Sequence, residues 1–515
     1  MILEKHFLLD QPRLNNIKSF FIFLNLFLSF IQLYLNEFNI FFLLIIIFFN
    51  IINIIICNIT FNKENLYFFL FPCIILFFSY FFYLFSPLIV KSIYFDSIFL
   101  NLENPFNSFK TILFYQCAII LSFKVFKSIY LNKYKKKLFF NDKLKFKIFV
   151  DYNKIENRKL FFILFAIKSY IIFLDSGSLS TTNFGDIFMK ILYGFERLYF
   201  LPILTTLNLF VIKKISKKEF IVFFLIYTLS SIFFALLTNS RSEIFNYLFL
   251  LIIILAFMSL SNKKLFENLL TVRSLLIFIV ISVFLSFLSE NILKNRTYRL
   301  DLTPIELLNK YNLEVQNNFE KFNDTSVIGP ETYVQNNALN RVIGGIKYYD
   351  KSLYEYSYFD TIDKQEFRSF TYKRILAIIP QNIINIFDKD YKKIDYQIAT
   401  GSYIEQKSNL RKTGDLNTGS YIVELYNLTN SYFLSFIVIF IIYYFSFYII
   451  SYFQEVKENK IKYSPLIFII FLIYNKLSIS DSLLSIMSGL IRSPVEILIL
   501  NLFLYMFVKK FTLNR

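Results

Sequence analysis

The sequence predicts an all-α polytopic membrane protein with about 12 transmembrane helices and one large, mostly helical extracytoplasmic loop. Hydrophobic residues make up 56% of the 515 residues, and the mean hydropathy of +0.51 is far above that of soluble globular proteins. Apolar runs of about 18 or more residues recur, each long enough to cross the hydrocarbon core as a helix. One polar stretch, residues 292–430, interrupts these runs. The runs are continuous rather than alternating, which indicates helical spans.

The apolar runs divide the chain into three parts. A first membrane domain covers residues 1–291, the large loop covers 292–430, and a second membrane domain covers 431–515. The spans are expected near residues 17–35, 38–59, 66–90, 111–130, 160–175, 190–212, 220–238, 244–261, 274–291, 431–454, 464–482 and 495–511.

The formal net charge of +18 is concentrated in short links between the spans. Lysine-rich links occur at residues 124–159, 213–218 and 509–515, whereas the large loop is nearly neutral, with 18 Lys+Arg against 17 Asp+Glu. An excess of Lys and Arg marks cytoplasmic links, so both termini are expected in the cytoplasm and the large loop outside it. Because the excess follows the links, we expect no nucleic-acid binding.

Helix signals occur within the large loop. Thr303-Pro304-Ile305-Glu306 has the pattern of a capping box with Pro at the first helical position, which predicts a helix to about Phe322. A second helix is expected from about Asp363 to Ile379, ending before Pro380. The pentapeptide TGSYI occurs twice, at residues 400–404 and 418–422. We expect the loop helices to lie over the membrane domain, because the loop has few apolar residues for a core of its own.

Composition also limits the kinds of site. The only histidine, His6, precedes the first span, which excludes histidine catalysis in the loop and any multi-histidine metal site. Cys57, Cys73 and Cys117 lie in apolar runs, where buried packing is expected. The chain has only 10 glycines, and its sequence contains no Gly-rich phosphate loop and no zinc-ligand spacing. We therefore expect no metal and no cofactor, and any phosphate would be held by side chains.

Arginines recur at the predicted outer surface. Arg197 lies early in a span, Arg241 lies in the link TNSRSE, and Arg492 lies in GLIRSPVE before the last span. The large loop adds Arg341 and Arg374. Guanidinium is a permanent cation whose donors match phosphate oxygens two at a time. These five residues are therefore candidates for binding a phosphate group of a lipid substrate.

Ion pairing within the protein is the alternative explanation for these charges. The outer arginines could pair with Glu196, Glu243 and Glu496, or with phospholipid. Lys168 and Asp175 also lie within or at the end of a span, where charge is expensive. They are seven residues apart and could share a helix face, so an interhelical ion pair or a snorkelling lysine is expected, with a proton or ion pathway as the alternative.

Three segments resemble the bacterial O-antigen polymerases (Wzy-type) and related oligosaccharide repeat-unit polymerases. LLTNSRSEIFNYLFLLIII is similar to that family's small-residue–Arg turn that opens a span, and RILAIIPQNI is similar to a loop segment ending in Pro. NTGSYIVELYNLTNSYFLSFIVIF resembles the stretch where the loop re-enters the membrane, with Glu424 before the span. The family is usually richer in glycine where this chain has residues 428–431. Around twelve spans and a large late outer loop also fit the family.

The resemblance implies a substrate, a reaction and a location. The substrate would be an oligosaccharide repeat unit on undecaprenyl diphosphate, polymerised into an O-antigen or capsule-like polysaccharide at the outer leaflet of the bacterial cytoplasmic (inner) membrane. The enzyme would be a glycosyltransferase that needs no metal or nucleotide, because the donor carries a diphosphate leaving group. Its partners would be membrane lipid, a chain-length regulator and a flippase.

The resemblance also implies roles for residues. Arg241 and Arg374 would bind diphosphate, and Glu424 would be the base, unless it only complements the dipole of the span that follows it. Further substrate-binding candidates are Arg341, Arg492 and Arg197. The alternatives are a lipid-linked oligosaccharide flippase or exporter and an O-antigen ligase-like glycosyltransferase. Related ligases are expected to use a loop histidine, and this chain has none.

Overall fold

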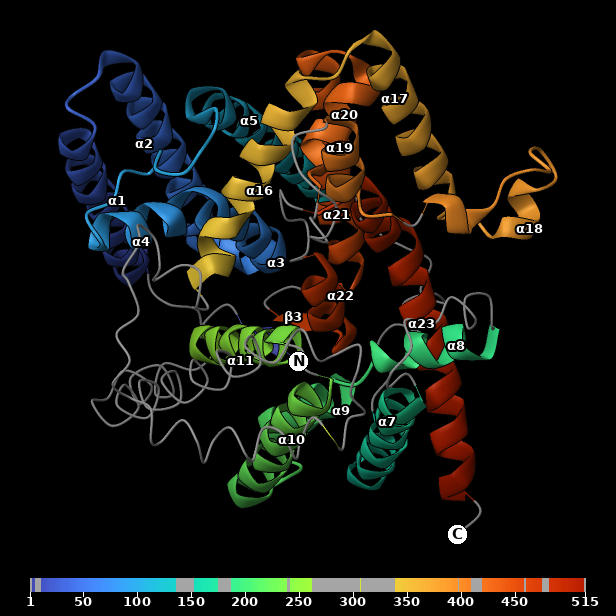
Figure 1. The fold of residues 1–515 in the computed structure, drawn as a ribbon. Helices are drawn as coiled ribbons and strands as arrows, with labels where there is room; N and C mark the ends of the chain where they lie inside the picture. Colours follow the sequence, from blue (N-terminus) through green and yellow to red (C-terminus); the bar gives the residue numbers. More distant parts are fainter. Residues whose placement is uncertain are drawn as a thin grey trace.

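The computed structural model describes residues 2–4, 11–135, 152–174, 187–238, 241–261, 306, 339–396, 398–408, 419–457, 460–474 and 481–513. Helices dominate these residues, as the sequence predicts for a membrane protein (Figure 1).

Seven helical segments of the described chain are long and apolar enough to cross a membrane. Each overlaps a predicted span, and the last begins twelve residues before the span expected at residues 495–511. The segments are α1 (Gln11–Leu35), α2 (Ile40–Thr60), α3–η2–α4 (Lys63–Tyr80, Phe81–Phe85 and Ser86–Ile93), α5 (Pro105–Lys135), α10 (Lys217–Leu237), α21 (Tyr432–Tyr452) and α23 (Leu483–Leu513).

Four of the remaining predicted spans match the structure only in part or lie outside the described chain. Helices α7 (Lys154–Leu174) and α11 (Arg241–Ser261) occupy two of them without being among the seven segments. Helix α22 (Leu466–Tyr474) covers only the first half of another, and residues 475–480 lie outside the described chain. The span expected at residues 274–291 also lies outside it.

The expectation of one span over residues 190–212 is wrong. The structure has two short helices there, α8 (Ile187–Glu196) and α9 (Leu201–Val211), separated by a turn. Pro202 lies in the first turn of α9, where its missing N–H leaves no intrahelical hydrogen bond unmade. Hydropathy alone does not detect this break, because both helices are apolar.

Polar side chains join the first helices across the apolar bundle. Asn25 Nδ2 on α1 donates to Asn50 Oδ1 on α2 at 2.6 Å, and Tyr80 on α3 donates to Asn25 Oδ1 at 2.9 Å. Gln32 on α1 donates to Ser92 on α4. Interhelical hydrogen bonds of this kind hold membrane helices together where lipid supplies no partner.

The expectation of a purely helical fold is wrong in one detail. The chain start, β1 (Ile2–Glu4), pairs antiparallel with β3 (Lys460–Tyr463), which pairs antiparallel with β2 (Gln454–Lys457). Strands β2 and β3 follow α21 directly. This small sheet ties the N-terminus to the link between the second membrane domain's first two helices, a long-range pairing that no local pattern reveals.

The described part of the large loop forms several helices. They are α16 (Leu339–Ser357), α17 (Thr361–Leu376), α18 (Gln381–Ile384), a 3-10 helix (Lys393–Tyr396), α19 (Thr400–Ser408) and α20 (Tyr421–Thr429). Helix α17 confirms the second predicted loop helix, and Asp360 caps it by accepting from the N–H of Asp363 at 2.7 Å. The first predicted loop helix, over residues 303–322, lies almost wholly outside the described chain.

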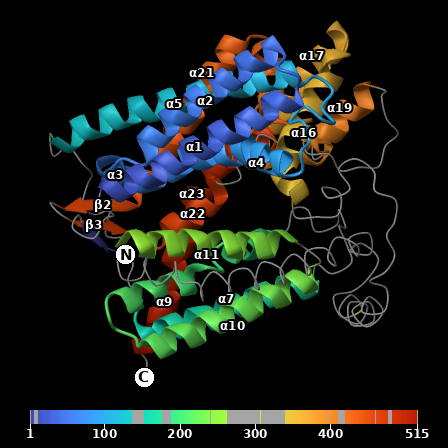
Figure 2. The same cartoon turned by 90° about the vertical axis from the view of Figure 1, so that its left-hand side faces the viewer.

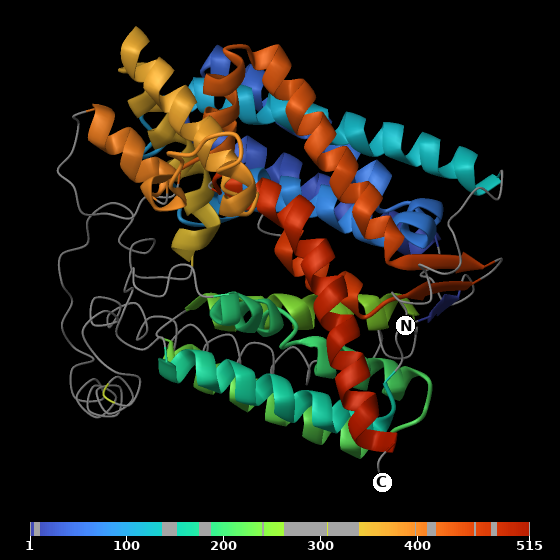
Figure 3. The same cartoon turned by 90° about the vertical axis from the view of Figure 1, so that its right-hand side faces the viewer.

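The loop helices and the small sheet lie at opposite ends of the molecule. Figures 2 and 3 show α16, α17 and α19 at one end of the helical layers, and the sheet and both termini toward the other. This separation agrees with a loop on one face of a membrane and termini on the other.

Asp350 on α16 joins the loop to the membrane domain. Its carboxylate accepts hydrogen bonds from the backbone N–H groups of Glu103 and Asn104 and from the Ser108 hydroxyl, all at the beginning of α5. Asp350 is 1% exposed. A carboxylate from a distant helix thus caps α5 and satisfies N–H groups that have no intrahelical partner.

We predict that Asp350→Ala destabilises the protein by about 1–2 kcal/mol, because buried N–H donors and the start of α5 lose their cap. The midpoint of thermal unfolding in detergent measures this effect. Asp390→Ala is the matched control, because Asp390 is exposed. Equal midpoints for the two variants would contradict the joining role of Asp350.

Candidate functional site

Two of the residues predicted from the sequence meet in a buried group that we call the loop cluster: Arg374, Thr400, Glu424 and the backbone of Leu483. Arg374 lies in the last turn of α17, Glu424 lies in the first turn of α20, and Thr400 begins α19. The side chains of Arg374 and Glu424 are buried, with 8% and 1% exposed. Residues 50 positions apart in the chain therefore share one site.

Hydrogen bonds link the members of the loop cluster. Arg374 Nη1 donates to the Thr400 hydroxyl, and the Thr400 side chain also lowers the pKa of the Glu424 carboxyl. The backbone N–H of Leu483, at the start of α23, donates to Glu424 Oε2 at 2.9 Å. Glu424 thus complements the start of its own helix and that of α23, rather than that of α21, the span that follows it.

The two TGSYI pentapeptides explain how this site is built. The first copy begins α19, and Ser420 of the second caps α20 by accepting from the N–H of Ile422. The copies pack closely, because a Cβ on Gly419 would lie 2.5 Å from Thr400 Cβ and 3.0 Å from the Gly401 nitrogen. Any larger residue at 419 would separate them.

Three helix N-termini consequently converge at the loop cluster. Helix α20 is joined to the segment before α23 by the hydrogen bond from Tyr421 N–H to the carbonyl of Asp481, 2.7 Å long. The N-termini of α19, α20 and α23 each carry a partial positive charge. Together with Arg374 they form an environment that favours an anion.

Burial sets the electrostatics of the loop cluster. It raises the pKa of the Glu424 carboxyl, and the Thr400 side chain, the charge of Arg374 and the Leu483 N–H oppose this rise only in part. Burial lowers the pKa of Arg374, opposed by the charge of Glu424. Arg374 Nε and Glu424 Oε1 have no hydrogen-bond partner among the described residues. The cluster therefore offers both a cation with an unused donor and a carboxyl that accepts protons readily.

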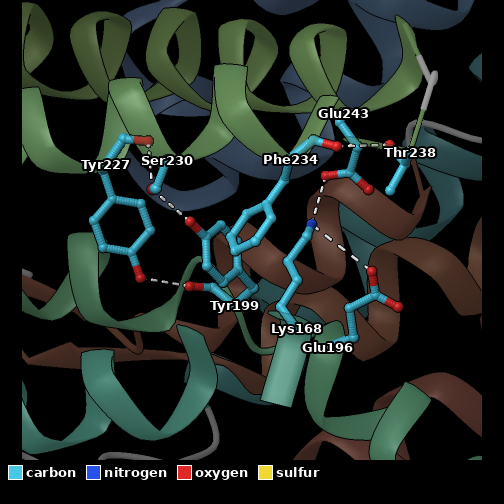
Figure 4. A network of polar contacts seen from close by, with 8 residues as sticks. All are labelled: Lys168, Glu196, Tyr199, Tyr227, Ser230, Phe234, Thr238 and Glu243. Carbon is cyan, nitrogen blue, oxygen red and sulfur yellow. Dashed lines mark hydrogen bonds and ion pairs between the residues drawn. The ribbon is translucent and has the colours of Figure 1, made fainter. Parts of the chain in front are cut away.

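A second group, the charge network, contains Lys168, Glu196, Arg197, Glu243, Arg492 and Glu496. Its centre is Lys168 on α7, which is 3% exposed and pairs with Glu243 of α11 at 2.6 Å and Glu196 of α8 at 3.7 Å (Figure 4). The ammonium also lies over the ring of Tyr199, 4.6 Å from its centroid. The interhelical ion pair expected for Lys168 is therefore confirmed, whereas Asp175 lies outside the described chain.

The remaining members of the charge network share one carboxylate. Arg197 and Arg492 contact Glu496 Oε2 at 3.0 and 3.3 Å. Gly194 on α8 permits this approach, because a Cβ there would lie 2.8 Å from Glu496 Oε1 and 2.5 Å from Leu500 Cδ1. Two cations and one carboxylate leave a local excess of one positive charge.

The charge network brings together the three arginine-carrying segments for which the sequence predicts an outer location. Lys168 links α8 and α11, and Arg197 links the end of α8 to α23. Arg241 is the first residue of α11, two positions before Glu243, and Arg341 lies in the first turn of α16. The side chains of Arg241 and Arg341 are outside the described part of the structure, so their predicted roles stay predictions.

Helix α23 connects the two groups. Leu483 at its first position contacts Glu424, and Arg492 and Glu496 follow nine and thirteen residues later. At 1.5 Å per residue these intervals correspond to about 14 and 20 Å along the helix axis. Among the candidate cations whose side chains are described, Arg374 therefore lies in the loop cluster, beside the start of α23. Arg197 and Arg492 lie in the charge network, farther along the same helix.

Sequence reasoning did not include Thr400 in the site. Its side chain interacts with both Arg374 and Glu424. The sequence feature that could have pointed to Thr400 is the repeated pentapeptide TGSYI, whose first copy it begins. Among the described residues, no group of three His, Cys, Asp or Glu side chains could hold a metal ion.

Comparison with known proteins finds no matching family model, no matching curated protein and no matching solved structure. The chemistry of the two groups is therefore the basis for a functional assignment.

We predict that Lys168→Met lowers stability by about 3–5 kcal/mol, because it leaves two carboxylates without their buried partner. The double variant Lys168→Met/Glu243→Gln should recover much of this loss. Thermal unfolding in detergent measures both. Lys154→Met is the control, since Lys154 pairs with Glu219 at an exposed site and its removal should change little. A Lys168→Met protein as stable as the control would show that the network does not hold these helices together.

Proposed function

We propose that this protein joins oligosaccharide repeat units carried on undecaprenyl diphosphate into an O-antigen or capsule-like polysaccharide at the outer leaflet of the bacterial cytoplasmic membrane. The observation that supports this proposal most directly is the loop cluster. It combines a buried arginine, a buried carboxyl and three helix N-termini at the end of the molecule that carries the large loop. The resemblance of three sequence segments to repeat-unit polymerases supports it independently.

In the proposed reaction, a sugar hydroxyl of one repeat unit attacks the anomeric carbon of the growing glycan. A new glycosidic C–O bond forms, and the anomeric C–O bond to phosphate breaks. The diphosphate lipid leaves with the bonding electron pair, and the hydroxyl proton passes to Glu424. The Arg374 guanidinium and the helix N-termini offset the negative charge that develops on the leaving diphosphate. Because the donor brings its own leaving group, no nucleotide or cofactor enters this scheme.

The raised pKa of Glu424 suits the role of general base. A base works best when its pKa approaches the working pH, since it is then both deprotonated and basic enough to accept a proton. Thr400 holds Glu424 and Arg374 in one arrangement. The charge network is the weaker candidate for the diphosphate-binding site, because Arg197 and Arg492 already form ion pairs with Glu496.

Transport of a lipid-linked oligosaccharide is the alternative function that one observation favours. Lys168 is a buried cation flanked by two carboxylates, an arrangement that ion- or proton-coupled transporters use. The two functions differ in their energy source. Protein reconstituted in vesicles without any ion gradient should elongate a lipid-linked repeat unit if it is a polymerase, whereas a coupled transporter would require the gradient.

We predict that Arg374→Gln abolishes long-chain polysaccharide while single-repeat glycolipid accumulates. Loss of a cation beside the leaving diphosphate should slow the reaction by about 10²–10³-fold. The chain-length ladder on a gel, at equal protein level, measures the effect. Lys373→Gln is the matched control, because it removes the same charge from the neighbouring, half-buried position on α17. Normal ladders for Arg374→Gln would remove this residue from the site.

We predict a pH dependence that identifies Glu424 as the base. The base form exists only above its pKa, so the rate should fall as the pH drops through a value higher than the ~4.3 of an ordinary glutamate. Thr400→Val removes a hydroxyl that lowers this pKa, so the acidic limb should move to higher pH. Glu424→Gln should abolish the reaction. An unmoved acidic limb in Thr400→Val would assign the titration to another group.

We predict that the loop helices face the outside of the cell. In a variant whose three cysteines are replaced, a single cysteine at Asp390 should react with an impermeant thiol reagent after the outer membrane alone is permeabilised. A single cysteine at Lys217, at the start of α10, should react only after the inner membrane is opened. The reverse result would place the loop cluster in the cytoplasm and exclude the proposed substrate side.

A further inference from the structure

A groove between α7 and α10 is lined by no member of the two residue groups described above. Its volume is about 480 Å³. Arg158 of α7 and Lys218 and Glu219 of α10 line it near the beginnings of the two helices. Farther along the same helices its walls are apolar and are formed by Phe161, Phe162, Val222, Phe223 and Ile226. The groove therefore changes from charged to apolar along the helix axes.

The charged end of the groove is cationic. Glu219 pairs with Lys154 and also caps α10, where it accepts from the backbone N–H of Ser216. No ion pair involving Arg158 or Lys218 is present among the described residues. The N-terminus of α10 adds a partial positive charge at the same end. Two cations that have no carboxylate partner among the described residues thus lie at the charged end of the apolar groove.

The groove opens toward the outside of the helix bundle, where lipid would surround a membrane-spanning helix. Phe162 is 67% exposed and Val222 is 50% exposed, so the apolar walls face the surroundings of the helices. Helix α10 is one of the segments long and apolar enough to span a membrane. From Lys218 to Ile226 the groove follows eight residues, about 12 Å along the helix at 1.5 Å per residue.

The charged end of the groove belongs to the end of the molecule opposite the loop cluster. Tyr152, just before α7, donates to Asn501 in the later part of α23 at 3.2 Å. Figures 2 and 3 show this part of α23 and the start of α10 toward the sheet and the termini. A lipid in the groove would therefore have its head group in the leaflet away from the proposed site of polymerisation.

We propose that this groove binds an anionic phospholipid of that leaflet. Its head-group phosphate would lie between Arg158 and Lys218, and part of one acyl chain would lie along Phe162, Val222 and Ile226. Charge complementarity selects an anionic over a zwitterionic head group, because Arg158 and Lys218 have no ion-pair partner among the described residues and Glu219, the carboxylate that lines the groove, pairs with Lys154. The leaflet distinguishes this lipid from the polymerisation substrate.

The absence of tryptophan from the chain permits a direct test. Phe162→Trp would introduce the only indole, on the wall of the groove. The full-length variant is reconstituted in phosphatidylcholine vesicles containing increasing fractions of brominated phosphatidylglycerol, whose bromines quench a contacting indole. Quenching should saturate at a low fraction of the brominated anionic lipid. The same titration with brominated phosphatidylcholine should require a much larger fraction.

Three further variants separate a specific site from general surface attraction. Arg158→Gln and Lys218→Gln, each added to Phe162→Trp, should weaken the preference for phosphatidylglycerol by about five-fold per cation removed. Lys217→Gln removes the same charge beside the groove without lining it, and it should keep the preference. Ile221→Trp, on the same helix at the same depth but outside the groove, should show no preference.

Two results would overturn the proposal. One is equal quenching of Trp at position 162 by the two brominated lipids. The other is a preference that Lys217→Gln reduces as much as Lys218→Gln, which would show a diffuse attraction to the basic segment. Neither measurement uses polymerisation, so failure here leaves the proposed function to its own tests.

Discussion

Removing a charge from water requires a partner within the protein, and this requirement shapes the described structure. Lys168 pairs with carboxylates from two other helices, Asp350 caps a helix that begins almost 250 residues earlier, and Glu424 accepts the first N–H of α23. Each contact joins elements that are distant in the chain. The helices of the loop and of the membrane domain are thus held in register by a few buried polar groups within an apolar bundle.

Helix α23 is the element through which these contacts are connected. Its first residue belongs to the loop cluster, Arg492 and Glu496 follow in the charge network, and Asn501 in its second half contacts Tyr152. A substitution that shifts this helix would therefore affect the loop cluster and the charge network together.

The two ends of the molecule offer different chemistry to lipids. At the loop end, Arg374 and three helix N-termini surround a carboxyl with a raised pKa, which suits a diphosphate and a proton acceptor. At the other end, Arg158 and Lys218 lie beside an apolar groove with no catalytic group, which suits a resident phospholipid. In the proposed arrangement one lipid would be a reactant and the other a structural partner, and the two would lie at opposite ends of the bundle.

The sequence alone determined the helical membrane class, most span positions and the helix that begins after Asp360, because hydropathy, capping residues and Pro380 act locally. It also identified Arg374 and Glu424 as candidates. Only the tertiary structure decided that these two meet through Thr400, that Glu496 pairs with both Arg197 and Arg492, and that residues 190–212 form two helices. It also revealed the sheet formed by β1, β2 and β3. The physical reason is that a charged residue on an apolar helix must find some partner, but which partner it finds depends on which helices are neighbours, and local sequence does not specify that.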